Sequence, residues 1–307
     1  MFEILRTASK VCALLVPGLI LLASGSALAA ATEDCVKGRG DAKINGCTEL
    51  IREIPTNAIP YYNRGTAYKA KGERDRAIAD YTKAIELDPR YTLAYAARGI
   101  AHYERGQARS DLTDQDLAIA DYTKAIELDP KYALAYNNRG NAYYITKDYD
   151  RAIADYSKAL EIDPKVAFAY NNRGHAYYIT KDYDRAIADY SKALEIDPKY
   201  ALAYNNRGNA HTAAGEYDLA IGDYTKAIEL DPKYALAYNN RGNAYKTMAE
   251  YDLAIADYSK ALEINPKYAF GYINRGNAYK AKGEYFGAIA DYTTALALVW
   301  AERSRGV

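Results

Sequence analysis

The chain has 307 residues, of which half are hydrophobic and 26% are charged, and its 40 basic residues balance 40 acidic ones. Such a composition predicts a soluble, ordered protein. Because the formal net charge is zero, the chain lacks the basic surplus with which proteins bind phosphate backbones. We therefore expect no nucleic-acid partner.

The N-terminal 29 residues are typical of a Sec-type secretory signal. Arg6 and Lys10 precede the apolar stretch VCALLVPGLILLA, and an Ala-Leu-Ala tripeptide supplies the small-x-small pattern at which such signals are cut. We expect residues 1–29 to be removed before Ala30. The apolar stretch is short and contains a Pro-Gly pair, so no stable membrane insertion is expected after cleavage; an uncleaved anchor is the alternative. The hypothesis is a periplasmic or secreted protein.

Cleavage at that point leaves two cysteines, Cys35 and Cys47. A pair of cysteines in an oxidising compartment suggests one disulfide. The sequence KINGCTELI around Cys47 matches the second helix of the repeats described next. Residues 30–57 are therefore predicted to form a degenerate, disulfide-pinned half-repeat that caps the N-terminal end. Free thiols, a redox site or a metal site are the alternatives, but no His or third Cys lies nearby to complete a metal site.

From Ala58 onward the chain repeats a 34-residue pattern seven times. The copies span residues 58–91, 92–132, 133–166, 167–200, 201–234, 235–268 and 269–302, which together form an array at 58–302 and leave 303–307 as a C-terminal tail. Each copy has one helix-period pattern before a Gly or Lys turn and another after it. This indicates two helices that bury their apolar faces by stacking on neighbouring copies. The second copy carries seven extra residues, expected near 110–115, which should lengthen one hairpin.

A Gly recurs in the middle of every predicted first helix. Because Gly in a helix costs roughly 1 kcal/mol relative to Ala, its recurrence, as at Gly65 and Gly208, predicts a close helix crossing with small residues such as Ala77 facing it. Each copy also has an Arg before that Gly and an Asp in its second helix, as in Arg207 and Asp223. We hypothesise that these charges pair between helices; two independently solvated charges are the alternative.

The 34-residue period with recurring Tyr, Gly, Ala and Pro resembles the tetratricopeptide repeat family from Ala58 to about Ala297. The family's large first-helix aromatic matches Tyr136 and its equivalents, and its Pro matches six positions ending at Pro266. The resemblance implies an all-α fold, a right-handed α-solenoid of about seven helix-turn-helix units preceded by the degenerate half-repeat. It also implies that the first helices line a concave groove that holds extended peptides or a partner's helix.

Asn side chains recur on the helices that would line this groove. They are Asn137, Asn138, Asn141, Asn171, Asn172, Asn205, Asn206, Asn209, Asn239, Asn240, Asn243, Asn274 and Asn277. A carboxamide offers both a donor and an acceptor, so a row of them can bind an extended peptide backbone. The row resembles the asparagine-lined superhelix of the eukaryotic O-linked N-acetylglucosamine transferases, and only that non-catalytic part is matched. The alternative is a scaffold role, in which these Asn bond to neighbouring turns.

Large apolar residues also recur near the starts of the first helices. They are Leu134, Phe168, Leu202, Leu236 and Phe270. Two interpretations stay open for them, either as apolar pockets of the groove or as packing between repeats.

Nothing in the sequence predicts an enzyme. It contains no P-loop, no GxSxG elbow, no HExxH and no dinucleotide-binding fingerprint, and its carboxylates are distributed once or twice per repeat. His102 and His211 stand where other copies have a core Tyr, so we interpret them as core substitutions. His175 replaces an Asn and is interpreted as a surface or groove variant. We expect no catalytic residue, no metal and no cofactor.

The last copy ends in Leu298, Val299 and Trp300 where the others have a Pro. We expect Trp300 to fold back onto the last hairpin; an end-to-end or two-fold contact in a homo-oligomer is the alternative. The function predicted from the whole sequence is a non-enzymatic scaffold of the cell envelope that binds a protein or extended peptide in the Asn-lined groove. The alternative function is a self-assembling structural component of the envelope that uses the ends of its array.

Overall fold

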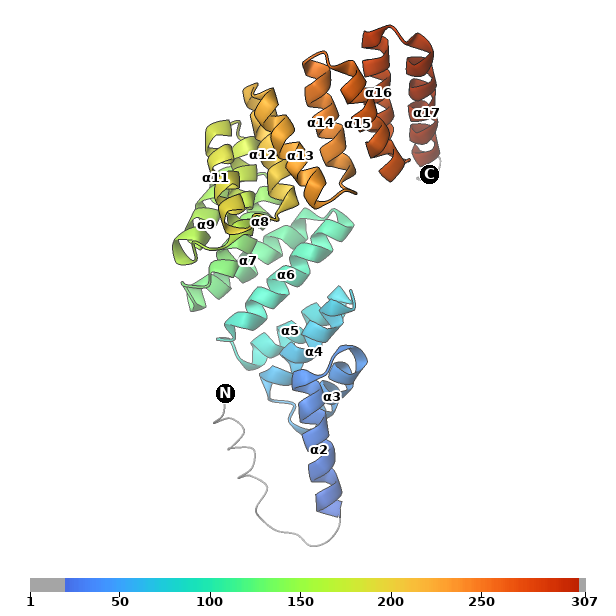
Figure 1. Cartoon of the computed structure of the whole chain (residues 1–307). Coiled ribbons are helices and arrows are strands. Elements are labelled where there is room, and N and C mark those ends of the chain that lie inside the picture. Colours follow the sequence, from blue (N-terminus) through green and yellow to red (C-terminus); the bar gives the residue numbers. More distant parts are fainter. Residues whose placement is uncertain (1–19, 304–307) are drawn as a thin grey trace. The chain divides into compact units, whose positions relative to one another are not determined.

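The computed structural model describes residues 20–303, and every regular element in that range is an α-helix. The sixteen helices of this described segment follow one another as antiparallel pairs joined by short turns (Figure 1). This confirms the predicted all-α class of stacked helix-turn-helix units. Most of the predicted signal segment, residues 1–19, and the final residues 304–307 lie outside the described residues.

The chain divides into two compact units, Met1–Pro130 and Lys131–Val307. The first unit contains α2 (Ile20–Lys37), α3 (Gly40–Glu53), α4 (Ala58–Ala70), α5 (Arg74–Leu87), α6 (Thr92–Arg109) and α7 (Leu112–Leu128). The second contains α8 (Ala133–Ile145), α9 (Tyr149–Ile162), α10 (Ala167–Ile179), α11 (Tyr183–Ile196), α12 (Ala201–Ala214), α13 (Tyr217–Leu230), α14 (Ala235–Thr247), α15 (Tyr251–Ile264), α16 (Ala269–Lys282) and α17 (Tyr285–Arg303). Within each unit, a first helix packs on its own second helix and on the second helix of the preceding pair.

The helix ends follow from residues that recur in each pair. Every second helix from α5 to α15 ends at an Asp or Asn that precedes a Pro; Asp197, for example, is extended, with φ −126° and ψ 91°. The residue before a proline is kept out of the helical region, so the helix stops there. The turn after each first helix contains one residue with positive φ, which is Gly215 after α12 and Lys147 after α8. That residue reverses the chain into the second helix.

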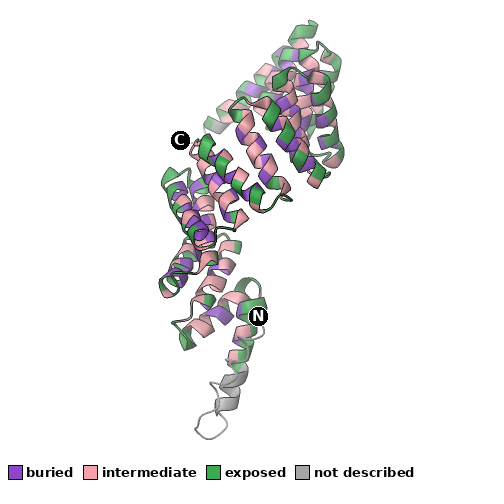
Figure 2. Ribbon diagram, turned by 90° about the vertical axis from the view of Figure 1, so that its left-hand side faces the viewer, coloured by how far each residue is buried: buried purple, intermediate pink, exposed green. Residues whose placement is uncertain are grey.

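A fully buried Tyr from the second helix forms the centre of most pairs. The set is Tyr81, Tyr122, Tyr156, Tyr190, Tyr224 and Tyr258. The ring lies directly on the mid-helix Gly, since a Cβ atom on Gly208 would lie 2.7 Å from Cε1 of Tyr224. The prediction that Ala faces this Gly is confirmed at Gly65, where an added Cβ would also lie 3.2 Å from the carbonyl oxygen of Ala77. The prediction did not include that the nearest atoms to the Gly belong to the Tyr ring. Figure 2 shows that buried positions recur along the helices and alternate with intermediate and exposed ones.

The seven-residue insertion lengthens both helices of the second repeat. α6 has 18 residues and α7 has 17, whereas α8 and α9 have 13 and 14. The added turns pack on each other, because Gly106 lies against Asp114 and Gln115, and Arg105 Nε donates to the Asp114 carboxylate at 2.9 Å. The insertion therefore extends this hairpin by about one turn on each side.

Each repeat holds one Arg–Asp pair across its two helices, which confirms the hypothesised pairing. Arg207 donates from Nε and Nη2 to the carboxylate of Asp223 at 2.8 and 2.7 Å, and from Nη1 to Ser191 of the preceding repeat at 3.0 Å. The bond to Asp223 holds the pKa of Arg207 above its ordinary value, although burial opposes the shift. The equivalent pairs are Arg64–Asp80, Arg98–Asp121, Arg139–Asp155, Arg173–Asp189, Arg241–Asp257 and Arg275–Asp291.

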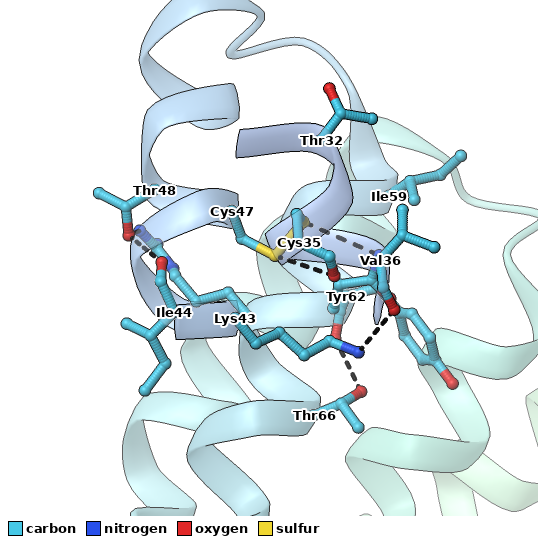
Figure 3. The surroundings of a disulfide bond; sticks show 12 residues. Thr32, Cys35, Val36, Lys43, Ile44, Cys47, Thr48, Ile59, Tyr62 and Thr66 are labelled. Atoms are coloured by element: carbon cyan, nitrogen blue, oxygen red, sulfur yellow. Dashed lines mark hydrogen bonds between the residues drawn. A yellow bond between two sulfur atoms is a disulfide. The ribbon is translucent and has the colours of Figure 1, made fainter. Parts of the chain in front are cut away.

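A disulfide between Cys35 and Cys47 joins α2 to α3, as predicted (Figure 3). Both cysteines are buried. α2 begins at Ile20 and passes through the predicted cleavage point before Ala30, so this helix includes the end of the predicted signal segment. Among the residues that the structure describes, no helix is both long and apolar enough to cross a membrane.

The last second helix, α17, continues to Arg303 as a single helix of 19 residues. Trp300 is 70% exposed and Leu296 is 60% exposed. The prediction that Trp300 folds back onto the last hairpin is therefore wrong. The reason is local, because Trp300 replaces the Pro that ends the other second helices, and the preceding Leu, Ala and Val residues let the helix continue.

Candidate peptide-binding face

The first helices of the second unit, α8, α10, α12, α14 and α16, share one face, which we call the amide face. Successive first helices contact one another. Residues four and seven positions apart, such as Leu134, Asn138 and Asn141, lie on the same side of a helix. One large apolar side chain per helix is exposed on this face: Leu134, Phe168, Leu202, Leu236 and Phe270. Each of these apolar side chains therefore leaves a part of its surface open to solvent.

One set of the predicted Asn residues is buried beneath the amide face. These residues are Asn137, Asn171, Asn205 and Asn239. Each accepts a hydrogen bond from the next first helix: Asn206 Nδ2 donates to Asn171 at 3.0 Å, and Asn240 Nδ2 donates to Asn205 at 3.0 Å. The corresponding bonds from Asn172 to Asn137 and from Asn274 to Asn239 measure 3.2 and 2.9 Å. These four buried carboxamides tie the first helices together and are covered from solvent.

A second set of the predicted Asn residues stays at least partly exposed: Asn138, Asn141, Asn172, Asn206, Asn209, Asn240, Asn243, Asn274 and Asn277. Asn209 shows how they are held. Its Oδ1 accepts from the Tyr224 hydroxyl at 2.8 Å and from Asn240 Nδ2 at 3.1 Å. Asn141 accepts in the same way from Tyr156, at 2.8 Å, and from Asn172, at 3.1 Å.

These bonds decide which amide atoms are left for a ligand. The Oδ1 atoms of Asn141 and Asn209 already accept two hydrogen bonds each, whereas their Nδ2 atoms have no partner among the described residues. Asn172 is the reverse, because its Nδ2 donates twice and its Oδ1 is unused. The bonded pair of Asn141 and Asn172 therefore presents one free donor and one free acceptor, which are the two groups that a peptide backbone needs.

His175 interrupts the row of carboxamides. Its ring stacks on Tyr144 of the preceding repeat, with centroids 5.1 Å apart and planes at 25°, and on Tyr178 at 6.4 Å and 16°. Burial lowers the pKa of His175 below its ordinary value. Tyr190 is left without the Asn bond that Tyr156 and its equivalents make. The sequence interpretation of His175 as a groove variant missed this stack, although a Tyr three residues later was a visible signal.

Beside this stack lies a cavity of about 220 Å³. It is lined by Tyr178, Asn209, Thr212, Ala213, Tyr224, Asn240 and Asn243. Thr212 and Ala213 stand where the two preceding repeats have a Tyr and an Ile, so smaller side chains contribute to the space. The cavity combines aromatic walls with carboxamides and has no charged residue in its lining.

The other two histidines take no part in the amide face. His102 is buried, and its Nδ1 lies 3.2 Å from Asp114, in agreement with its interpretation as a core substitution. His211 is half-buried, with Nδ1 2.6 Å from the Glu216 carboxylate. In the part of the chain that the structure describes, no three His, Cys, Asp or Glu residues are grouped so that they could hold a metal ion.

Stacked helical pairs whose first helices share one face define the class of this protein as an α-solenoid repeat scaffold. The chain belongs to the tetratricopeptide repeat family. One family model, Tetratricopeptide repeat, matches residues 58–91, 133–166, 167–200 and 235–268. A second, TPR repeat, matches 106–147 and 208–248, and a third, also Tetratricopeptide repeat, matches 190–222 and 258–290.

Two curated relatives resemble short parts of the chain. Small glutamine-rich tetratricopeptide repeat-containing protein 2 of Saccharomyces cerevisiae is 45% identical over 58 residues, which are 19% of this chain and 17% of that protein. UDP-N-acetylglucosamine–peptide N-acetylglucosaminyltransferase of Giardia intestinalis is 40% identical over 57 residues, which are 19% of this chain and 4% of that protein. The chain thus spans less than a fifth of either relative.

Among solved structures, the crystal structure of MamA is similar over a longer range. It shares 31% sequence identity with this chain at a TM-score of 0.51, and the match covers 54% of this chain and 96% of MamA.

Proposed function

We propose that this protein is a non-enzymatic scaffold that binds an extended peptide segment of a partner protein on the amide face. The observation that carries the proposal is the presence of two rows on the same helices, one of exposed apolar side chains and one of carboxamides with unused hydrogen-bonding groups. An extended peptide presents side chains and backbone N–H and C=O groups in alternation, so it fills both rows at once.

The dimensions of the amide face suit such a peptide. Packed helices lie about 8–10 Å apart, and an extended chain rises about 3.3 Å per residue, so each repeat corresponds to about three peptide residues. The five first helices of the second unit therefore accommodate a segment on the order of ten residues. This length is enough for both recognition of the backbone and selection among side chains.

The cavity beside Tyr178 supplies an anchor point for one side chain of the peptide. Because no charged residue lines it, a charged anchor would lose its hydration without gaining an opposite charge. The free Nδ2 of Asn209 offers a hydrogen bond, and the Tyr178 ring offers an apolar wall. We therefore propose an uncharged anchor residue with a flat or apolar side chain.

The proposed location is the bacterial periplasm or the outside of the cell, with no catalytic role. The buried disulfide between Cys35 and Cys47 supports export, because such bonds persist in oxidising compartments. The relative with an enzyme name is matched over only 4% of its length, within a repeat segment. Its name describes an action on peptides, which agrees with a peptide-binding role for the repeats.

The test compares variants that change the face and preserve the scaffold. Peptides selected from a random library on the wild-type protein would be measured by fluorescence anisotropy against Asn209→Asp and Leu202→Ser. The Asp keeps the oxygen that accepts from Tyr224 but loses the free donor, and Leu202 is exposed. Each change should weaken binding about tenfold, which corresponds to roughly 1.4 kcal/mol.

The matched control is Leu219→Ser, because Leu219 is also exposed but belongs to the second helix α13. Its binding should equal that of the wild type. If both variants of the amide face bind the selected peptides as tightly as the control does, the proposed site is wrong. If the library yields no peptide at all, peptide binding itself is rejected.

A further inference from the structure

α17 carries an apolar seam on its exposed side. The seam consists of Phe286, Ile289, Thr293, Leu296 and Trp300, whose spacing of three, four, three and four residues places them on one side of the helix. Phe286 is 92% exposed and Ile289 is 62% exposed, and Leu296 and Trp300 are similarly open. From Phe286 to Trp300 the seam is about 21 Å long.

Comparison with α15 shows that this seam is more than an uncovered repeat interface. The residues 34 positions earlier than Phe286 and Trp300 are Asp252 and Pro266, so a charge and a helix breaker have become aromatic side chains. In α15, Leu262 is buried and lies against Gly271 of the next repeat, whereas its equivalent Leu296 is exposed. The lack of a following repeat explains why Leu296 is exposed. It does not explain why Phe286 and Trp300 stand at positions that hold Asp and Pro in the preceding repeat.

α17 has also lost the ion pair that the other second helices of this unit carry on their exposed side. Lys260 and Glu263 lie 2.5 Å apart in α15, and equivalent pairs occur in α9, α11 and α13. In α17 these two positions are Thr294 and Ala297. The exposed side of this helix is therefore nearly without charge, which is expected of a buried contact surface.

We propose that α17 pairs antiparallel with α17 of a second copy of this chain. The order of side chains in the seam is symmetric in size about its centre: an aromatic residue, an aliphatic one, Thr293, an aliphatic one and an aromatic one. A two-fold contact requires a surface that is complementary to itself. In the antiparallel pair, Phe286 of each copy meets Trp300 of the other, Ile289 meets Leu296, and Thr293 lies beside its own copy.

A second copy fits this seam better than a membrane surface does. Helices that lie in a membrane interface keep a polar face rich in Lys and Arg. The side of α17 opposite the seam instead packs on α16, where Asp291 is bonded to Arg275. The proposal is independent of peptide binding, because the amide face belongs to the first helices.

Sedimentation equilibrium of the full chain over a concentration series provides the first test. The wild type should be dimeric at the higher concentrations, and Phe286→Glu or Trp300→Glu should raise the dissociation constant at least tenfold. The matched control is Phe270→Glu, since Phe270 is an aromatic residue of similar exposure on the amide face; it should dimerise like the wild type. Phe286→Glu should in turn bind selected peptides normally. A wild type that stays monomeric throughout the series overturns the proposal.

Disulfide trapping tests the geometry in a Cys12→Ser background, in which the remaining native cysteines are already paired with each other. Thr293→Cys alone should form a covalent dimer on mild oxidation. Phe286→Cys alone should not, but a mixture of Phe286→Cys and Trp300→Cys proteins should crosslink. Crosslinking of Phe286→Cys with itself indicates a parallel pairing and refutes the antiparallel one. A monomer that instead sediments with phosphatidylglycerol vesicles through Trp300 assigns the seam to a membrane surface and also refutes the proposal.

Discussion

Replacing Gly208 by Ala should destabilise the second unit, although the same change stabilises most exposed helix positions. The added Cβ would lie 2.7 Å from Cε1 and 2.9 Å from Cδ1 of Tyr224. Those distances are too short for carbon atoms, so either the ring or the helix must shift. The ring is held in place, because its hydroxyl is bonded to Asn209 at 2.8 Å and to Thr212 at 3.0 Å.

The expected loss in the free energy of unfolding for Gly208→Ala follows from three contributions. Overpacking a filled site costs about 1–3 kcal/mol, and a displaced Tyr224 hydroxyl costs about 1 kcal/mol through its lost hydrogen bond. The higher helix propensity of Ala offsets about 1 kcal/mol of this cost. The net expectation is a free energy of unfolding lowered by about 1–3 kcal/mol.

Gly222 provides the matched control in the same helical pair. It is exposed in α13, and a Cβ placed there would meet nothing within 4 Å. The equivalent positions in neighbouring repeats already hold Ala188 and Ala256. Gly222→Ala should therefore stabilise by about 0.5–1 kcal/mol.

Urea unfolding followed by circular dichroism measures both changes. Because stacked repeats unfold as coupled neighbours rather than always in one step, the two variants are best compared with each other and with the wild type in the same buffer. Opposite shifts of the midpoint are expected. If Gly208→Ala and Gly222→Ala stabilise equally, the contact between Gly and the Tyr ring does not constrain the helix crossing, and the reasoning is refuted.

Three other predictions concern the polar network and the N-terminal pair. Arg207→Gln should cost about 3 kcal/mol, because it takes the guanidinium away from the buried Asp223 carboxylate. A double-mutant cycle with Asp223→Asn should give a coupling energy above about 1 kcal/mol, and additive effects would contradict the pairing. Reduction of the Cys35–Cys47 disulfide should destabilise α2 and α3 by about 3 kcal/mol, seen as faster hydrogen exchange in these helices with the last repeats unchanged. Burial lowers the pKa of His175 below 6.5, so its contribution to stability is complete above pH 6.5 and is lost as the pH falls through the lowered value. His175→Asn should therefore lose less stability between pH 7.5 and pH 5 than the wild type does. Equal losses in the two proteins would contradict a lowered pKa of His175 in the folded state.

Much of the fold was predictable because its determinants are local. A residue before Pro leaves the helical region in any context, so the ends of the second helices could be placed from the Asp-Pro pairs alone. The pairing of Arg207 with Asp223 could be inferred because both recur with the 34-residue period. The disulfide followed from there being two cysteines after the predicted cleavage point. None of these inferences required knowledge of how distant side chains pack.

The sequence predicted which residues form the candidate site, but not which of their hydrogen-bonding atoms are left without a partner. Asn171 and Asn172 are neighbours in sequence with the same chemistry, yet Asn171 is buried and Asn172 is half-buried with an unused oxygen. Which atom is used depends on the next repeat, which supplies the Asn206 donor. The stack of Tyr144 on His175 likewise joins residues 31 positions apart.

By itself, the sequence determined the repeat pattern, the two helices in each repeat and the ends of the second helices that precede a Pro, because period, propensity and proline act over a few residues. The tertiary structure alone decided that the Tyr224 ring lies closest to Gly208, and that Trp300 stays exposed. These outcomes depend on the volume between packed helices and on which surfaces the neighbouring helices cover, and both quantities exist only after the repeats have stacked.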